Sequence, residues 1–174
     1  MAHGERPTVA PATAEDIDDV TDMWVSLAAG QRRHGSTLSA EANRGNVREW
    51  VARSVVVGEL LVARERDGDP VGFVGFSIDR EGYERDVVRG TVSNLFVVPS
   101  RRNEGIGANL LDAAERALAA AGAERVALET LADNERARDF YTERGYDHHR
   151  VELTKPVSEA VADESDDEPT SDGD

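Results

Sequence analysis

A glycine-containing turn is the first part of this sequence whose residue types could do chemistry. The stretch "RRNEGIGANLL", residues 101–111, follows an apolar run and carries Gly105 and Gly107. If a helix begins there, its first backbone amides can hold a phosphate, and glycine lets the phosphate approach closely. The preceding pair, Arg101 and Arg102, would add positive charge. A tight strand-to-helix turn without a ligand is the alternative, and the absence of GK[ST] argues against magnesium-nucleotide hydrolysis.

The elements that must position this turn follow from hydrophobic periodicity. A first helix is expected to begin at Thr13, because Asp16 stands three residues later as in a capping box. A second helix is expected over about residues 40–54, with Val47, Trp50 and Val51 facing inward. The remaining elements are strands over 59–65, 71–78 and 90–99, a helix over 105–121, a strand over 125–131, a short helix over 134–145 and an alternating strand over 146–155.

This order predicts an α+β or mixed α/β domain, with a mostly antiparallel sheet flanked by helices. The strands over 59–65 and 71–78 are joined by "RDGDP", which is typical of a hairpin turn. The glycine turn follows the third strand of a meander instead of opening a repeated βαβ array, so a Rossmann fold is excluded. The buried stripe of the 105–121 helix is expected to consist of Leu110, Leu111, Ala114 and Leu118.

The composition restricts the possible partners. The formal net charge is −15 and no basic stripe is present, which argues against nucleic acid. No apolar run is long enough to cross a membrane and no signal-peptide core is seen, so we expect a cytoplasmic protein. There is no cysteine, which excludes disulfides, cysteine zinc sites and a cysteine nucleophile.

The charge pattern also divides the chain. We expect one domain over residues 1–156 and a disordered acidic tail over 157–174, because the tail combines few apolar groups with eight acids. Only Lys155 is a lysine among the 20 basic residues. A lysine-poor acidic chain indicates a salt-loving source, where salt screens the self-repulsion; an ordinary acidic protein with a charged tail is the alternative.

Two motifs together resemble a known family. "NLFVVPSRRNEGIGANLL" is similar to motif A of the GCN5-related N-acetyltransferase (GNAT) superfamily, with Arg102, Gly105 and Gly107 at its [Q/R]-x-x-G-x-[G/A] positions. "LETLADNERARDFYTERGY" is similar to motif B. Its matching residues are Leu128, Glu129, Asn134, Ala137, Phe140, Tyr141, Gly145 and Tyr146. The resemblance covers about residues 6–155 and implies the GNAT fold.

The resemblance implies an acyl-coenzyme A donor, usually acetyl-CoA. Its pyrophosphate would bind the backbone amides of Asn103, Glu104, Gly105, Ile106, Gly107 and Ala108, assisted by Arg102. Its pantetheine arm would pair with the splayed strand at Leu95, Phe96 and Val97, as an added strand does, and Asn134 would hold the end of the arm. The family often has glycine and a basic residue where this chain has Asn103 and Glu104, so a repulsive carboxylate is expected beside the pyrophosphate.

The same resemblance implies the groups that move protons. Tyr141 would donate a proton to the leaving thiolate, since a family tyrosine does so at this place. Glu129 would act as the base, as in relatives that acylate protein N-termini; a solvent-facing or structural glutamate is the alternative. Phe140 is expected to be the core residue of this pair. Ser93 and Asn94 stand where other relatives keep a carboxylate, and Glu81, Glu84 and Asp86 are weaker candidates for the base.

The sequence leaves the acceptor open. It would be a primary amine on a small metabolite, an amino acid, or a protein N-terminus or lysine, with a slight preference for N-termini. A CoA-binding protein without catalysis is the competing hypothesis, favoured by Glu104 and by the missing carboxylate at Asn94. His3, His34, His148 and His149 have no spacing that fits a metal site. A homodimer is expected from the resemblance.

Overall fold

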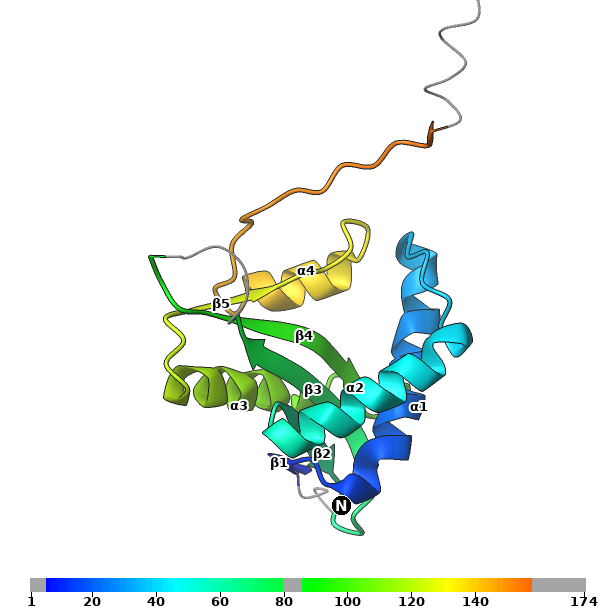
Figure 1. Cartoon of the computed structure of the whole chain (residues 1–174), viewed down its shortest axis with the longest axis vertical. Helices are drawn as coiled ribbons and strands as arrows, with labels where there is room; N and C mark the ends of the chain where they lie inside the picture. The colour runs from blue at the N-terminus through cyan, green and yellow to red at the C-terminus, as the bar shows by residue number, and fades with distance from the viewer. Residues whose placement is uncertain (1–5, 80–85, 158–174) are drawn as a thin grey trace, which may run out of the picture. The chain divides into compact units, whose positions relative to one another are not determined.

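The computed structural model describes residues 6–79 and 86–157, and it divides into two units at Arg138, which are treated separately (Figure 1). The strands are β1 (Thr8–Pro11), β2 (Leu60–Arg64), β3 (Pro70–Ile78), β4 (Arg89–Val97) and β5 (Arg125–Leu128). The α-helices are α1 (Ile17–Gln31), α2 (Arg44–Val57), α3 (Ile106–Ala120) and α4 (Glu135–Thr142). Short 3-10 helices are η1 (Ala14–Asp16), η2 (Arg32–His34), η3 (Glu41–Asn43) and η4 (Pro99–Arg101).

The five strands form one sheet in chain order within the first unit. The pairs from β1 to β4 are antiparallel, and β4 pairs with β5 in parallel through the α3 crossover. The predicted α+β class, with a mostly antiparallel sheet flanked by helices, is therefore confirmed. Parallel neighbours require such a crossover connection, whereas the β2–β3 pair needs only its short turn.

The helices cover opposite faces of the sheet (Figure 1). A Cβ atom on Gly75 of β3 would lie 2.9 Å from the Trp50 ring of α2, while one on Gly72 would lie 3.1 Å from Leu110 of α3. Positions three apart on a strand point to opposite faces. The sheet therefore lies between α2 on one face and α3 on the other.

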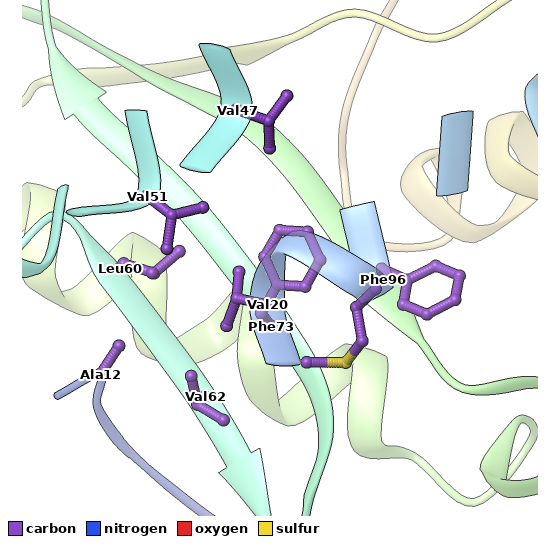
Figure 2. Packing of buried hydrophobic residues seen from close by; sticks show 9 residues of the cluster. Ala12, Val20, Val47, Val51, Leu60, Val62, Phe73 and Phe96 are labelled. Carbon is purple, nitrogen blue, oxygen red and sulfur yellow. The ribbon is translucent and has the colours of Figure 1, made fainter. Parts of the chain in front are cut away.

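The core between the sheet and the first two helices is apolar and closely packed. Figure 2 shows its central side chains, with Val20 of α1 and Val51 of α2 directed at Phe73 and Leu60. All four are essentially inaccessible to solvent. Trp50 packs against this cluster, as its predicted inward direction requires. Burial of such side chains contributes about 1.5–3 kcal/mol each, so this face is a substantial source of stability.

A buried ion pair fixes the start of the first helix. The Thr13 backbone N–H donates to Asp16 Oδ2 at 2.6 Å, and the Thr13 hydroxyl lies 3.1 Å from the same oxygen. The helical segment begins with η1, directly after Thr13, as predicted. Arg64 of β2 pairs with Asp16, whose side chain is only 2% exposed. Burial raises the pKa of Asp16, but the hydrogen bonds from Arg64 and Thr13 and the charge of Arg64 outweigh it and hold the pKa below its ordinary value.

Three predictions about the C-terminal part are wrong. Residues 146–155 form no strand, and Val151 and Leu153 are 74% and 90% exposed. An alternating segment becomes a strand only when a neighbour accepts its backbone hydrogen bonds, and no ladder is described for this one. The strand predicted over 125–131 ends at Leu128, so Glu129 is not inside it. Phe140 is only partly buried, and the Arg144 guanidinium lies over its ring, 4.1 Å from the ring centroid.

The helix after the glycine turn matches its prediction closely. Leu110, Leu111, Ala114 and Leu118 are all buried, and Gly122 follows the helix in the left-handed conformation. Within the described residues, no helix has the length and apolar character to cross a membrane. The predicted acidic tail lies almost entirely outside the described residues.

Candidate active site

The sheet opens at a fork between β4 and β5. The two strands pair only as far as Val92 and Leu128. At the next position Ser93 is an extra residue in β4, because Asn94 pairs with Gly75 while Val92 pairs with Phe76. Such a bulge bends and twists the strand that carries it. The bulge therefore lies where β4 and β5 part, and among the described residues the rest of β4 has a neighbouring strand on one side only.

The open edge of β4 carries unpaired backbone groups. The Val98 N–H donates to the Val71 carbonyl oxygen at 2.9 Å, which makes these two residues a hydrogen-bonded pair beside β3. Bonded and non-bonded pairs alternate in an antiparallel ladder, so the backbone groups of Val97 and Leu95 point away from β3. Arg102 Nε donates to the Val97 carbonyl oxygen at 3.0 Å. The Val97 N–H and both groups of Leu95 remain available to an added strand-like ligand.

The glycine turn presents a run of free amides. Asn103 and Gly105 have positive φ angles, 65° and 81°. Gly105 precedes α3, whose first N–H groups have no partner within the helix. In the described part of the chain, the N–H groups from residue 103 to residue 108 donate to no other group. Successive free amides in a turn of this kind form an anion-binding concavity, and a side chain at Gly105 would be strained by its φ.

Glu104 is paired with a neighbouring arginine. Arg101 Nη2 lies 2.8 Å from the Glu104 carboxylate, and Arg101 Nη1 pairs with Glu65. The hydrogen bond from Arg101 holds the pKa of Glu104 below its usual range, and the same bond raises the pKa of Arg101. The expected repulsion between Glu104 and a bound pyrophosphate is therefore reduced, although Arg101 shares its single charge with Glu65.

Arg102 is the charged side chain of the turn that has no acidic partner among the described residues. Its guanidinium lies 5.5 Å from the Phe96 ring centroid and is held by the Val97 carbonyl. Burial lowers the pKa of Arg102, and the positive charges of Arg136 and Arg33 lower it further. No carboxylate forms a salt bridge with Arg102 in the described part of the chain. A nearby anion would compensate this positive charge.

The candidate base lies at the fork. Glu129 is the first residue after the last β4–β5 pair, Val92–Leu128, and it is exposed. Ser93, the bulged residue of β4, likewise directly follows that pair in its own strand. Asp86, one of the weaker candidates, is exposed ahead of β4. Glu81 and Glu84 lie outside the described residues.

Asn134 caps the last helix. Its Oδ1 accepts a hydrogen bond from the Ala137 N–H at 3.2 Å, and this bond satisfies one of the free amides at the start of α4. Its side-chain NH₂ has no partner in the described part of the chain and can donate to a ligand. Asn134 thus has a structural role that the sequence analysis did not assign.

Tyr141 belongs to the second unit. Its ring packs edge-on against Phe140 and Tyr146, at centroid distances of 5.2 and 5.7 Å. Burial raises the pKa of Tyr141 to about 12. The hydroxyl is therefore protonated at neutral pH, which is the state that a proton donor needs.

Sequence reasoning missed the residues that approach the turn from elsewhere. Arg136 Nη2 donates to Asn103 Oδ1 at 2.9 Å, and Arg33 contributes to the charge around Arg102. His34 Nδ1 lies 3.2 Å from the Asp133 carbonyl oxygen, 99 positions along the chain. No pattern in the sequence links these segments. No cluster of metal-ligating side chains is present within the described ranges.

The comparisons with known proteins agree with this geometry. The sequence model of the Acetyltransferase (GNAT) family matches residues 23–146, and the chain therefore belongs to that family. It is 32% identical over 135 residues to an uncharacterized N-acetyltransferase of Archaeoglobus fulgidus, covering 75% of this chain and 86% of that protein. It is 31% identical over 146 residues to the aminoalkylphosphonate N-acetyltransferase of Salmonella typhimurium, covering 84% and 88%.

Solved structures share the fold at lower identity. A GCN5-related N-acetyltransferase from Ralstonia eutropha matches with a TM-score of 0.68 and 24% identity, over 87% of this chain and 98% of that chain. The aminoglycoside N-acetyltransferase AAC(6')-Iy, solved with CoA, matches with a TM-score of 0.70 and 17% identity, over 90% and 98%. Family and relatives together make this protein an acyl-CoA-dependent acetyltransferase. The open β4 edge and the free amides of the turn fit the pantetheine and phosphate groups of CoA.

Proposed function

We propose that the protein transfers an acetyl group from acetyl-CoA to a primary amine by direct attack. The observation that carries this proposal is the continuity of the ligand-binding backbone. The open edge at Leu95 and Val97 leads directly into the free amides of residues 103–108. The pantetheine arm of CoA contains amides and ends in a pyrophosphate, so it matches this order of backbone groups.

The proposed reaction needs no covalent enzyme intermediate. The amine nitrogen bonds to the thioester carbonyl carbon and the carbon–sulfur bond breaks. The nitrogen loses two protons in all, one before the attack and one as the amide forms. One proton is released to solvent through the base, and the other balances the proton that reaches the sulfur. Glu129 takes the proton from the amine, directly or through water, because it is exposed at the fork. Tyr141 supplies a proton to the thiolate, and the Val97 N–H donates to the thioester oxygen.

The proposed acceptor is a small amine or an amino acid, with a protein N-terminus or lysine as the wider class. The relative named for aminoalkylphosphonates and the structural neighbour named for aminoglycosides support a small-molecule amine. The proposal includes a cytoplasmic enzyme that works at high salt, with the catalytic domain over residues 1–156 and a homodimeric assembly. These additions rest on the composition and on the family resemblance.

The acceptor is found by a thiol-release assay. Acetyl-CoA is incubated with the full chain and with pooled amines, including aminoalkylphosphonates, aminoglycosides, amino acids and short peptides, at low and molar salt. We expect at least one pool to release CoA thiol and to yield an N-acetylated product by mass spectrometry. An enzyme that binds CoA but acetylates nothing in the panel would contradict the proposal.

The proton donor is tested on the acceptor that this screen identifies. Replacing Tyr141 by Phe should lower turnover by about a hundredfold, because general acid catalysis contributes at least that much. The affinity for CoA should stay unchanged. Tyr146→Phe, which alters the adjoining ring in the same way, serves as the matched control. Turnover of Tyr141→Phe at the wild-type rate would remove the tyrosine from the mechanism.

A further inference from the structure

Three arginines from distant parts of the sequence meet beside the glycine turn. Arg102 follows η4, Arg33 lies in η2 and Arg136 lies in the first turn of α4. Arg136 Nη2 donates to Asn103 Oδ1 at 2.9 Å, which places it next to Arg102. The contact between His34 and Asp133 brings η2 to the start of α4. The three residues are called the arginine cluster below.

The arginine cluster has no acidic partner. In the described part of the chain, none of its members forms a salt bridge. Arg33 Nε donates to the Gly30 carbonyl oxygen at 3.0 Å, and Arg102 Nε donates to Val97. These bonds leave the terminal Nη groups of both side chains free to donate. In a chain with 35 acids and only 20 basic residues, these three guanidinium groups lie near one another without a paired carboxylate in the described part of the chain.

The cluster is also electrostatically unfavourable without a ligand. Burial lowers the pKa of Arg102, and the charges of Arg136 and Arg33 lower it further, so each of these charges repels it. An anion among the three would remove this repulsion and receive charge-assisted hydrogen bonds. The cluster therefore has the properties of an anion site instead of a salt-bridge network.

The free amides of the turn already match the pyrophosphate, so the cluster points to the second phosphate of CoA. We propose that Arg33 and Arg136, with Arg102 between them, bind the 3′-phosphate on the adenosine ribose of CoA. This inference rests on the proposed use of acetyl-CoA. It specifies the donor further, because a phosphopantetheine arm on a carrier protein has no 3′-phosphate. The enzyme would thus select free acyl-CoA over dephospho-CoA and over carrier-bound acyl groups.

Titration calorimetry with CoA and with 3′-dephospho-CoA tests this subsite. The full chain is used at the lowest salt at which it stays folded, because salt screens exposed charges. Wild type should bind CoA at least about tenfold more tightly than dephospho-CoA, as expected for charge-assisted hydrogen bonds. Arg33→Gln and Arg136→Gln should each lose about five- to tenfold in CoA affinity and change by less than about twofold for dephospho-CoA.

Arg116→Gln is the matched control. Arg116 lies on the exposed side of α3, forms no described interaction, and loses the same charge. Both affinities should stay within about twofold of wild type, since one exposed charge contributes little. Two results would overturn the 3′-phosphate subsite alone. In the first, wild type binds CoA and dephospho-CoA equally tightly. In the second, the Arg33 and Arg136 variants lose equal affinity for both nucleotides. Failure to bind either nucleotide would overturn the proposed function as well.

Discussion

Arginines in two regions of the protein have opposite surroundings. Around α1, α2 and β2, the side chains of Arg44, Arg48 and Arg64 each contact an acidic partner. Beside the glycine turn, the arginine cluster contacts carbonyl and amide oxygens but no carboxylate in the described part of the chain. Paired charges hold elements together, while charges left unpaired in an acidic protein are available for a ligand. The difference separates arginines that pair with acids from the arginines proposed to bind a ligand, within one sheet-and-helix unit.

The two arginines that begin the turn repeat this contrast at adjacent positions. Arg101 is paired with Glu65 and Glu104, and the hydrogen bond to Glu104 raises its pKa. Arg102 has no such partner, and burial together with neighbouring positive charges lowers its pKa. Residues of the same type, one position apart, therefore have different roles because their side chains point to different neighbours.

The largest effect on stability is expected where the paired region is most buried. Asp16→Ala would leave the Arg64 guanidinium without its partner and remove the capping bond to Thr13. We expect the free energy of unfolding to fall by about 3 kcal/mol, as for other broken buried pairs. Chemical denaturation measures this free energy. Asp18→Ala is the control: its pair with Arg48 is exposed, so its loss should cost less than about 1 kcal/mol. Equal losses of unfolding free energy in the two variants would contradict the distinction between the buried and the exposed ion pair.

The largest effect on binding is expected at the unpaired arginine of the turn. Arg102→Gln should weaken CoA binding by about tenfold, because a charge-assisted contact to a phosphate is lost. The free energy of unfolding should change by less than about 1 kcal/mol, since no ion pair is broken. Calorimetric titration with CoA and chemical denaturation of the same preparation measure both quantities. A loss of stability without a loss of affinity would place Arg102 among the structural arginines.

The pH dependence of stability distinguishes the buried pair from the other carboxylates. The pKa of Asp16 is lower in the folded protein than its ordinary value of 3.8, so the unfolded chain takes up this proton first. Its contribution to stability is present above that value and is lost as pH falls through the folded pKa. Thermal unfolding between neutral pH and about pH 3 should show a steeper decline for wild type than for Asp16→Asn. Parallel curves would exclude this carboxyl as a source of acid sensitivity.

The smallest effect is expected at the carboxylate that first suggested repulsion. Glu104→Gln should change the affinity for CoA by less than about threefold, because the Glu104 carboxylate is exposed and paired with Arg101. The double variant that combines Arg101→Gln with Glu104→Gln should bind CoA about as well as wild type. An increase of tenfold or more in the affinity of Glu104→Gln would show that the carboxylate still acts on the phosphate.

Local patterns were sufficient for much of the fold. Thr13 and Asp16 predicted the first helical cap because both partners lie within one turn. The stripe from Leu110 to Leu118 predicted the buried face of α3 because one periodicity sets both. The alternating residues 146–155 predicted a strand that the structure does not contain, since an alternating pattern supplies side-chain directions but no hydrogen-bonding neighbour.

The candidate site was predictable only in part. The glycines of the turn indicated an anion site, which stays a prediction; their expected position at the start of α3 is observed. The fork at Ser93 was not visible, because a bulge depends on the register between two strands. The approach of Arg136 to Asn103 was also not visible, because these residues are 33 positions apart and share no pattern.

The sequence by itself determined the element order through α4, the caps, the buried stripes and the family motifs, because each depends on residues close along the chain. Only the tertiary structure decided which charges are paired. Arg64 pairs with Asp16 across 48 positions and Arg101 pairs with Glu65, while the arginine cluster has no acidic partner among the described residues. Charge pairing depends on distances between side chains in space, and composition alone leaves those distances open.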